Sequence, residues 1–178
     1  MIRLTGGRDK GRYIKSPKGL STRPMNAVLR KVLFDTIGNA VVGALFLDVF
    51  AGVGTVGFEA LSRGAKKVVF VEKNRKVAEI IRENTKILGY QDRVEILVID
   101  AFRFPEYVRE SYDIVFLGPP YSLPKLGRLP LLFVGFLKPE GLMIVQHHHK
   151  TTVELPGGYD IRVKKVGENA LTFMRRIG

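Results

Sequence analysis

The sequence predicts an α/β fold built on a doubly wound, mostly parallel sheet, with a small basic extension at the N-terminus. Short apolar segments typical of buried strands alternate along the chain with segments of helical periodicity. Several of these strands end on an acidic residue, and a glycine-rich turn joins one of them to a helix. Alternating strands and helices favour right-handed crossover connections, which make the strands parallel.

The first part of the chain predicts an extension that packs with the rest. We expect residues 1–40 to form a basic arm and one helix within the same domain as residues 41–178. Alternating residues at 12–15 favour a short hairpin or arm over a helix. Apolar residues then recur at helical spacing up to Ile37, and Gly38 is expected to end this helix.

The rest of the predicted fold is organised around the stretch 48–57, Asp-Val-Phe-Ala-Gly-Val-Gly-Thr-Val-Gly. An apolar run at 44–47 predicts a buried strand that ends at Asp48, and a helix is expected over 55–62. The three glycines between them have G-x-G-x-x-G spacing, which lets a ligand approach the backbone and meet the free N–H groups of a helix N-terminus. This turn alone leaves two ligands open, a dinucleotide pyrophosphate and S-adenosylmethionine (SAM).

The rest of the chain continues the alternation. Further strands are expected at 67–72, 94–99, 112–117 and 142–147, helices at 74–89 and within 124–136, and two last strands from Tyr159 around a turn at 167–169. Asn74 and Gly89 are expected to cap the helix between them.

Acidic residues stand at the ends of three predicted strands, and a fourth strand runs into Gly-Pro-Pro-Tyr at 118–121. The acids are Asp48, Glu72 and Asp100. In a doubly wound sheet, ligands bind at the carboxyl ends of the strands, so these residues should meet there. Three acids suit hydroxyls, an amine and a sulfonium, and they would repel a pyrophosphate. The trio therefore favours SAM over a dinucleotide, which would need Glu72 alone.

Composition excludes several classes of protein. The 178-residue chain has no cysteine, which excludes disulfides and cysteine metal sites. No apolar run approaches the ~20 residues of a membrane span, and the basic N-terminus has no apolar segment typical of a secretory signal. We expect a cytoplasmic monomer. The triplet His147-His148-His149 lacks a third ligand nearby, so no metal site is expected.

Positive charge is concentrated at the two ends of the chain. Residues 1–40 carry nine Lys and Arg against two Asp and Glu, and residues 161–178 carry five against one, within a net charge of +12. Such segregation favours a patch that faces a polyanion such as nucleic acid. The cations expected to contact phosphates are Arg3, Arg8, Lys10, Arg12, Lys15, Lys18 and Arg23. Arg30 is a further candidate for a role besides packing.

The motifs together resemble the class I SAM-dependent amino-methyltransferases, which have a Rossmann-like fold. The residues that carry this resemblance are Asp-x-Phe-Ala-Gly-x-Gly at 48–54, the acid at 72, Asp-Ala at 100–101 and x-Pro-Pro-Tyr at 118–121. Motifs outside the turn narrow it further: Gly-Gly-x-x-Lys-Gly-Arg at 6–12, Ser-Pro-Lys-Gly-Leu-x-Thr-Arg-Pro at 16–24, Arg-x-x-Leu-Phe at 30–34 and Gly-Phe-Glu-Ala-Leu-Ser-Arg-Gly-Ala at 57–65. Over nearly its whole length, the chain is similar to the bacterial family that methylates guanine N2 in 16S ribosomal RNA.

The resemblance implies roles for individual residues. Asp48 would orient the methionine amino group of SAM, and the turn containing Ala51, Gly52 and Gly54 would lie against the cofactor. Glu72 would bind the ribose hydroxyls, and Asp100, followed by Ala101, would bind the adenine amine. On the substrate side, Pro119, Pro120 and Tyr121 would form the catalytic base pocket, with Tyr121 stacking on a guanine drawn out of its helix.

One departure from the family stands in this pocket. The family has Asp or Asn where this chain has Gly118, and the missing oxygen would accept a hydrogen bond from the target amine. On the resemblance as a whole, we expect methylation of guanine N2 in 16S rRNA, on naked RNA or on the small ribosomal subunit. A catalytically impaired RNA-binding relative that retains SAM binding is the first alternative, and a nucleotide-dependent oxidoreductase is the second.

Overall fold

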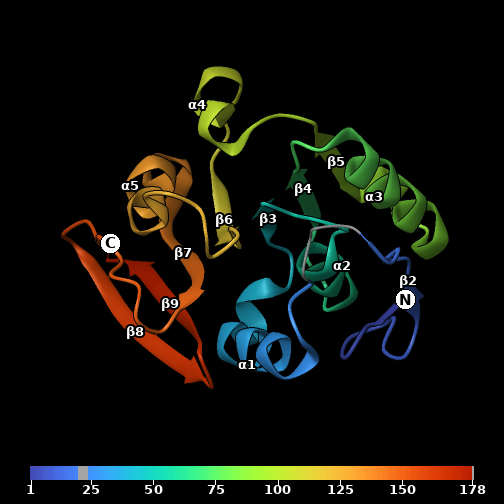
Figure 1. Cartoon of the computed structure of the whole chain (residues 1–178), viewed down its shortest axis with the longest axis horizontal. Coiled ribbons are helices and arrows are strands. Elements are labelled where there is room, and N and C mark those ends of the chain that lie inside the picture. Colours follow the sequence, from blue (N-terminus) through green and yellow to red (C-terminus); the bar gives the residue numbers. More distant parts are fainter. Residues whose placement is uncertain (20–23, 178) are drawn as a thin grey trace.

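Seven strands form one sheet in a computed structural model that describes residues 1–19 and 24–177. The order across the sheet is β5-β4-β3-β6-β7-β9-β8 (Figure 1). The bounds are β3 Leu45–Val49, β4 Lys67–Val71, β5 Val94–Leu97, β6 Tyr112–Leu117, β7 Leu137–His148, β8 Tyr159–Val166 and β9 Asn169–Arg176. Strands β3 to β7 are parallel, whereas β9 runs antiparallel to both β7 and β8. The predicted mostly parallel α/β fold is confirmed.

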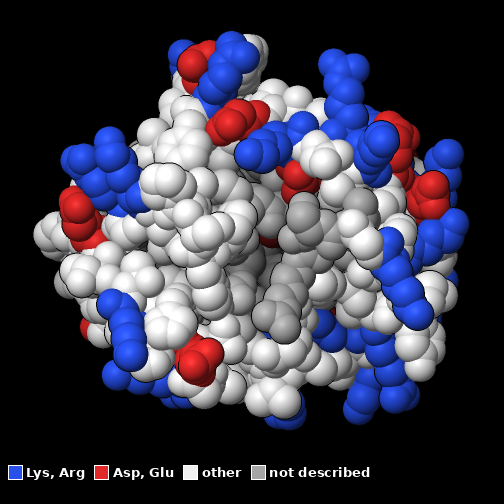
Figure 2. All heavy atoms as spheres, viewed as in Figure 1, with Lys and Arg blue, Asp and Glu red and all other residues white. Residues whose placement is uncertain are grey.

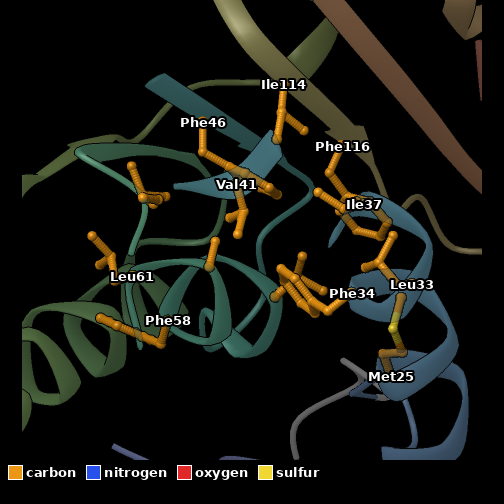
Figure 3. Close-up of a cluster of buried hydrophobic side chains, with 14 of the residues drawn as sticks. Met25, Leu33, Phe34, Ile37, Val41, Phe46, Phe58, Leu61, Ile114 and Phe116 are labelled. Carbon is orange, nitrogen blue, oxygen red and sulfur yellow. The ribbon is translucent and has the colours of Figure 1, made fainter. Parts of the chain in front are cut away.

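Helices cover both faces of this sheet. The helices are α1 Ala27–Ile37, α2 Thr55–Ser62, α3 Arg75–Leu88, α4 Phe104–Tyr107 and α5 Leu129–Phe133. Short 3-10 turns accompany them: η1 Gly38–Val41, η2 Gln91–Arg93, η3 Ala101–Arg103, η4 Leu126–Arg128 and η5 Val134–Phe136. Buried residues of α1, α2 and α3 pack on one face of the sheet, and those of α4 and α5 pack on the other. Figure 3 shows part of the hydrophobic cluster between the sheet and α1, α2 and α3, in which Ile37 of α1 lies beside Phe116 of β6.

Local signals explain the helix ends. Asn74 accepts hydrogen bonds from the backbone N–H groups of Lys76 and Val77, and Gly89 ends α3 in the left-handed conformation with φ 75°. Gly38 ends α1 with φ 58°. All three predicted caps are confirmed.

Two predicted elements differ from the structure. The strand expected at 142–147 begins earlier, because residues 138–141 also belong to β7, which starts at Leu137 and contains a register shift opposite Tyr112 and Ile114. The helix expected within 124–136 is one turn of α-helix between 3-10 turns, because Pro130 can occupy only its first turn.

The N-terminal arm is a hairpin docked on the domain. Its strands, β1 (Ile2–Arg3) and β2 (Tyr13–Ile14), pair antiparallel, as expected for a short hairpin. The fully buried Glu59 of α2 accepts hydrogen bonds from the backbone N–H and hydroxyl of Thr5 and forms an ion pair with Arg30 at 3.2 Å. Arg30 also donates to the backbone carbonyl of Arg3. Because Arg30 is 2% exposed and fully engaged, the second role considered for it is excluded.

Candidate active site at the carboxyl ends of the strands

The order of the strands reverses beside β3. The chain proceeds outward from β3 to β4 and β5, and then returns to the other side of β3 with β6. Such a reversal point is where open α/β sheets bind ligands. Figure 2 shows that one face of the molecule is hollowed near its centre, with Lys and Arg side chains mostly around its edge.

The backbone of the glycine-rich turn is held in unusual conformations. Phe50, Gly52 and Gly54 have φ angles of 63°, 58° and 92°, all in the left-handed region. A non-glycine residue there costs free energy and often marks a functional site. Gly57 is required for a different reason, since a Cβ at this position would lie 2.3 Å from the Phe70 ring. The motif therefore combines a sharp turn with close packing of α2 on β4.

Asp48 lies under the N-terminus of α2. One carboxylate oxygen accepts a hydrogen bond from the backbone N–H of Gly57 at 2.9 Å, and the residue is 1% exposed. Burial raises the pKa of Asp48 well above its ordinary value; the Gly57 N–H opposes this shift, and the negative charge of Glu72 adds to it. A buried carboxylate near a second one favours a positively charged ligand group.

Glu72 ties the turn to the start of α3. Its two carboxylate oxygens accept hydrogen bonds from the backbone N–H groups of Gly52 and Asn74, each at 2.9 Å. The residue is 8% exposed. Each oxygen keeps a second lone pair, so Glu72 can still accept hydrogen bonds from ligand hydroxyls.

The other predicted cofactor residues border this group. Asp100 follows β5 and caps η3 by accepting a hydrogen bond from the Phe102 N–H at 2.9 Å. Ala101 is buried on the face of the sheet that α4 and α5 cover. Ala51 is partly buried and packs on the opposite face, with α1, α2 and α3. Asp48 is the penultimate residue of β3, and Glu72 and Asp100 follow β4 and β5, so the predicted acids stand at the carboxyl ends of three neighbouring strands.

The Gly-Pro-Pro-Tyr segment follows β6 on the other side of β3. Pro119 is buried, Pro120 is exposed, and Tyr121 is 40% exposed. The Tyr121 hydroxyl accepts a hydrogen bond from Nε2 of Gln146 at 3.0 Å and donates one to Oδ1 of Asn169. Burial raises the pKa of Tyr121, and the hydrogen bond from Gln146 opposes that shift.

Gln146 and Asn169 are site residues that sequence reasoning missed. Gln146 is the first polar residue after the apolar run of β7, and Asn169 is the first residue of β9, where it pairs with Val166 of β8. A polar residue directly after an apolar run was the signal from which Gln146 could have been predicted. Asn169 gave none, because its contact with Tyr121 joins residues 48 positions apart.

Gly118 lies beside Gln146 and has no room for a side chain. It is not among the residues with positive φ, so its backbone would accept other residues. However, a Cβ at this position would lie 2.7 Å from Cε1 of Phe116, which is in the core, and 3.7 Å from Oε1 of Gln146. The pocket is therefore shaped around the glycine.

The three histidines have other partners. His147 is buried, with Nε2 2.7 Å from the Thr172 hydroxyl, and His148 stacks on His149 at 4.5 Å between ring centroids. Within residues 1–19 and 24–177, no group of three or more His, Asp or Glu side chains is arranged to hold a metal ion.

Several cations of the arm are engaged with the protein. Arg12 bonds Asp9 at 2.9 Å and the carbonyl of Ile87 at 2.7 Å, and Lys15 pairs with Glu83 at 2.7 Å. Arg8 lies over the Tyr90 ring at 5.0 Å, with a side chain that is 63% exposed.

The exposure of the other cations predicted to contact RNA is as follows. Arg3, Lys10 and Lys18 are exposed. Arg23 lies outside the described residues.

Comparison with known proteins decides the family. The family described as "Conserved hypothetical protein 95" matches residues 2–175. The chain belongs to this family. The Bacillus subtilis protein YlbH is 34% identical over 160 residues, which cover 87% of this chain and 86% of that protein. The Haemophilus influenzae protein "Ribosomal RNA small subunit methyltransferase D" is 29% identical over 170 residues, covering 92% and 88%.

Solved structures agree with this assignment. A Thermus thermophilus protein, TTHA0928, superposes with a TM-score of 0.84 at 32% identity and covers 99% of this chain and all of its own. The predicted resemblance to class I SAM-dependent methyltransferases is confirmed, and with it the Rossmann-like fold and SAM as cofactor. The donor set fits that cofactor, because three carboxylates match its amine, hydroxyls and adenine amine. No helix within the described residues is long and apolar enough to cross a membrane.

Proposed function

We propose that this protein methylates the exocyclic N2 amine of a guanine in small-subunit ribosomal RNA. The observation that supports it best is the meeting of three acids and Gly-Pro-Pro-Tyr at one sheet edge, in a chain of this family. Relatives named small-subunit rRNA methyltransferases span nearly the same length of chain, which favours ribosomal RNA as the substrate. The choice of guanine N2 rests on the motif resemblance.

The acids would hold the cofactor at the carboxyl ends of β3, β4 and β5. Asp48 would bind its amino group, Glu72 its ribose hydroxyls and Asp100 its adenine amine, while the turn at 51–54 would lie along it. Hydrogen bonds to Gly57, Gly52 and Phe102 already fix these three carboxylates. Such preorganisation lowers the entropy lost on binding.

The base would bind on the other side of β3. Tyr121 presents a partly exposed ring, and hydrogen bonds through its hydroxyl to Gln146 and Asn169 keep that ring oriented before a base arrives. An aromatic ring held in this way can stack on a base drawn out of its helix. Pro119 and Pro120 make the approach to the ring rigid.

The reaction is a displacement at carbon. When bound, the cofactor supplies a methyl group on a positively charged sulfur. Transfer to the amine nitrogen would form an N–C bond and break the C–S bond, whose electron pair would stay on sulfur, and the proton lost by the amine would go to water. The protein contributes alignment of the two reactants and stabilisation of the charge that develops on nitrogen.

Transfer of tritiated methyl from SAM to undermethylated small ribosomal subunits tests the function. We expect label in the 16S RNA, recovered after digestion as N2-methylguanosine, with naked 16S RNA assayed in parallel. Label in another nucleoside would contradict the guanine-N2 assignment and retain RNA methylation. RNA binding without label would favour the impaired relative, and label in no RNA with hydride transfer from a nicotinamide would favour the oxidoreductase.

A further inference from the structure

We infer that the side-chain amide oxygen of Gln146 accepts a hydrogen bond from the target amine, in the role that a side chain at position 118 cannot fill. This inference rests on the proposed function and names a catalytic residue for it. Gln146 and Tyr121 would then act as one unit, in which Tyr121 and Asn169 position the amide and Gln146 contacts the substrate.

The register of the sheet places Gln146 next to Gly118. Leu117 of β6 pairs with Val145 of β7, so the next residue of each strand lies side by side at the carboxyl edge. Alternate residues of a strand share a face, and Ile144 belongs to the cluster on the α1 side, as Phe116 does. Gln146 and position 118 therefore project to the same side of the sheet, where Oε1 lies 3.7 Å from the Cβ position of residue 118.

The core prevents residue 118 from carrying its own acceptor. Phe116 is 2% exposed, and its ring atom Cε1 lies 2.7 Å from where a Cβ would stand. A side-chain oxygen for the amine must therefore come from another residue. Outside residues 117–119, Oε1 of Gln146 is the polar atom closest to that position.

Hydrogen bonds fix which end of the Gln146 amide faces Gly118. The Tyr121 hydroxyl has one proton, which it donates to Oδ1 of Asn169. It can therefore only accept from the amide, and it does so from Nε2 of Gln146 at 3.0 Å. With Nε2 engaged, the acceptor Oε1 is directed toward Gly118. Among the described residues, Oε1 has no hydrogen-bond partner of its own.

An acceptor at this place has a chemical consequence. A hydrogen bond from one amine proton to Oε1 turns the nitrogen so that its lone pair can face the methyl group. It also stabilises the positive charge that nitrogen acquires during transfer. Loss of one oriented polar group of this kind typically lowers a rate by ~10²–10³-fold.

The first test compares Gln146→Met with Gln146→Glu. Met has a similar length without an acceptor, and Glu keeps an oxygen at the same place. In single-turnover methyl transfer to undermethylated small subunits at saturating SAM, we expect Gln146→Met to be slower by about 10²-fold. Gln146→Glu should stay within about tenfold of the wild type. Calorimetry should give the same SAM affinity for all three proteins, because the amide contacts the base side.

A second readout does not depend on turnover. After mass spectrometry has located the methylated nucleotide, RNA fragments with guanosine or inosine at that position are compared in binding. Inosine lacks the exocyclic amine. We expect the wild type to prefer guanosine by about tenfold, the value of one hydrogen bond of roughly 1.4 kcal/mol, and Gln146→Met to lose this preference. Tyr121→Phe, which removes the hydroxyl and keeps the ring, should weaken the preference in part.

The outcomes separate the inference from the proposed function. Wild-type transfer with an equally fast Gln146→Met and an unchanged guanosine preference would overturn the inference and leave the function standing. A wild type that methylates no small-subunit RNA would overturn the function, and the inference with it. If Gln146→Met does not fold, Tyr121→Phe with unaltered transfer and preference would overturn the positioning of the amide on which the inference depends.

Discussion

The side chain of Asn84 clamps the backbone of Lys15 with two hydrogen bonds. Its Oδ1 accepts from the Lys15 N–H at 2.7 Å, and its Nδ2 donates to the Lys15 carbonyl at 3.1 Å. The same Nδ2 donates to the carbonyl of Val53, within the glycine-rich turn, at 3.1 Å. Asn84 is fully buried. One side chain thus connects the basic arm to the cofactor turn.

Replacing Asn84 should loosen both segments. Asn84→Ala removes the hydrogen-bond partners of the Lys15 backbone and of the buried Val53 carbonyl, and we expect a loss of about 2–4 kcal/mol in the free energy of unfolding. Urea denaturation measures this loss, and limited proteolysis should show earlier cleavage in the arm. The matched control is Glu83→Ala, one residue away, which removes only a surface ion pair. Equal stability of the two variants would contradict the clamp.

Replacing Asp48 should stabilise the protein while weakening cofactor binding. Its raised folded pKa means that Asp48 favours folding below its unfolded pKa of ~3.9 and loses this contribution as pH rises through the folded pKa. Asp48→Asn mimics the protonated form and can still accept from the Gly57 N–H. We therefore expect Asp48→Asn to raise the melting temperature above that of the wild type at pH 7, by roughly 2–4 °C for each kcal/mol gained in the free energy of unfolding. This difference should shrink toward pH 4.

The same variant should bind SAM less tightly by about 10–100-fold, because a charged hydrogen bond to the amino group is lost. Calorimetry at pH 7 measures the affinity. A variant that is less stable at pH 7, or that binds SAM as the wild type does, would contradict the role assigned to Asp48.

Calorimetry with SAM and with NAD tests the role assigned to Glu72. We expect Glu72→Ala to weaken SAM binding by one to two powers of ten, at ~1.5–3 kcal/mol for the charged hydrogen bonds. Since Glu72 also holds Gly52 and Asn74, Glu72→Gln is the control that keeps size and one acceptor. Calorimetry that found tight NAD binding and no SAM binding would contradict the site.

The arm cations should differ in their effect on the salt dependence of RNA binding. Neutralising Arg8, Lys10, Arg12 and Lys15 together is expected to flatten the log–log slope by at most about three, at ~0.7 per contact with single strands. Arg12 bonds Asp9 and the Ile87 carbonyl, so most of its effect should fall on stability instead.

The sharper variant is therefore Arg8→Gln with Lys10→Gln, with an expected change of about 1.4 in slope. Filter binding over a range of salt concentrations measures it. Lys31→Gln, on α1 and paired with Asp35, is the control that should leave the slope unchanged. An unaltered slope in the double variant would show that the arm does not face phosphate.

Adding a side chain at position 118 should not help catalysis. The family pattern alone suggests that Gly118→Asp would raise methyl transfer, but its Cβ would lie 2.7 Å from the core ring of Phe116. We expect lower stability by about 1–3 kcal/mol, the usual cost of overpacking, and no faster transfer. Thermal melts and single-turnover assays measure both. A faster and equally stable variant would show that Phe116 moves aside.

The pattern of residues along the chain was enough to predict the cofactor half of the site. Asp48, Glu72 and Asp100 each stand at the end of a predicted strand, and parallel strands bring their carboxyl ends to one edge whatever their order. The glycine spacing at 52–57 likewise predicts a turn and a helix start, because backbone conformation there depends on local sequence. The N-terminal hairpin and the caps of α3 follow from similar local signals.

Only the tertiary structure shows which residues surround Tyr121 in the substrate half of the site and which charged side chains are buried in ion pairs. Gln146 meets Tyr121 because β7 pairs with β6, and Asn169 reaches the same hydroxyl because β9 inserts between β7 and β8. These pairings join residues 25 and 48 positions apart. From the sequence, Arg30 is an available cation. In the fold it forms a buried ion pair with Glu59, which lies 29 positions away. Strand pairing and charge burial depend on such distant partners, which no local pattern specifies.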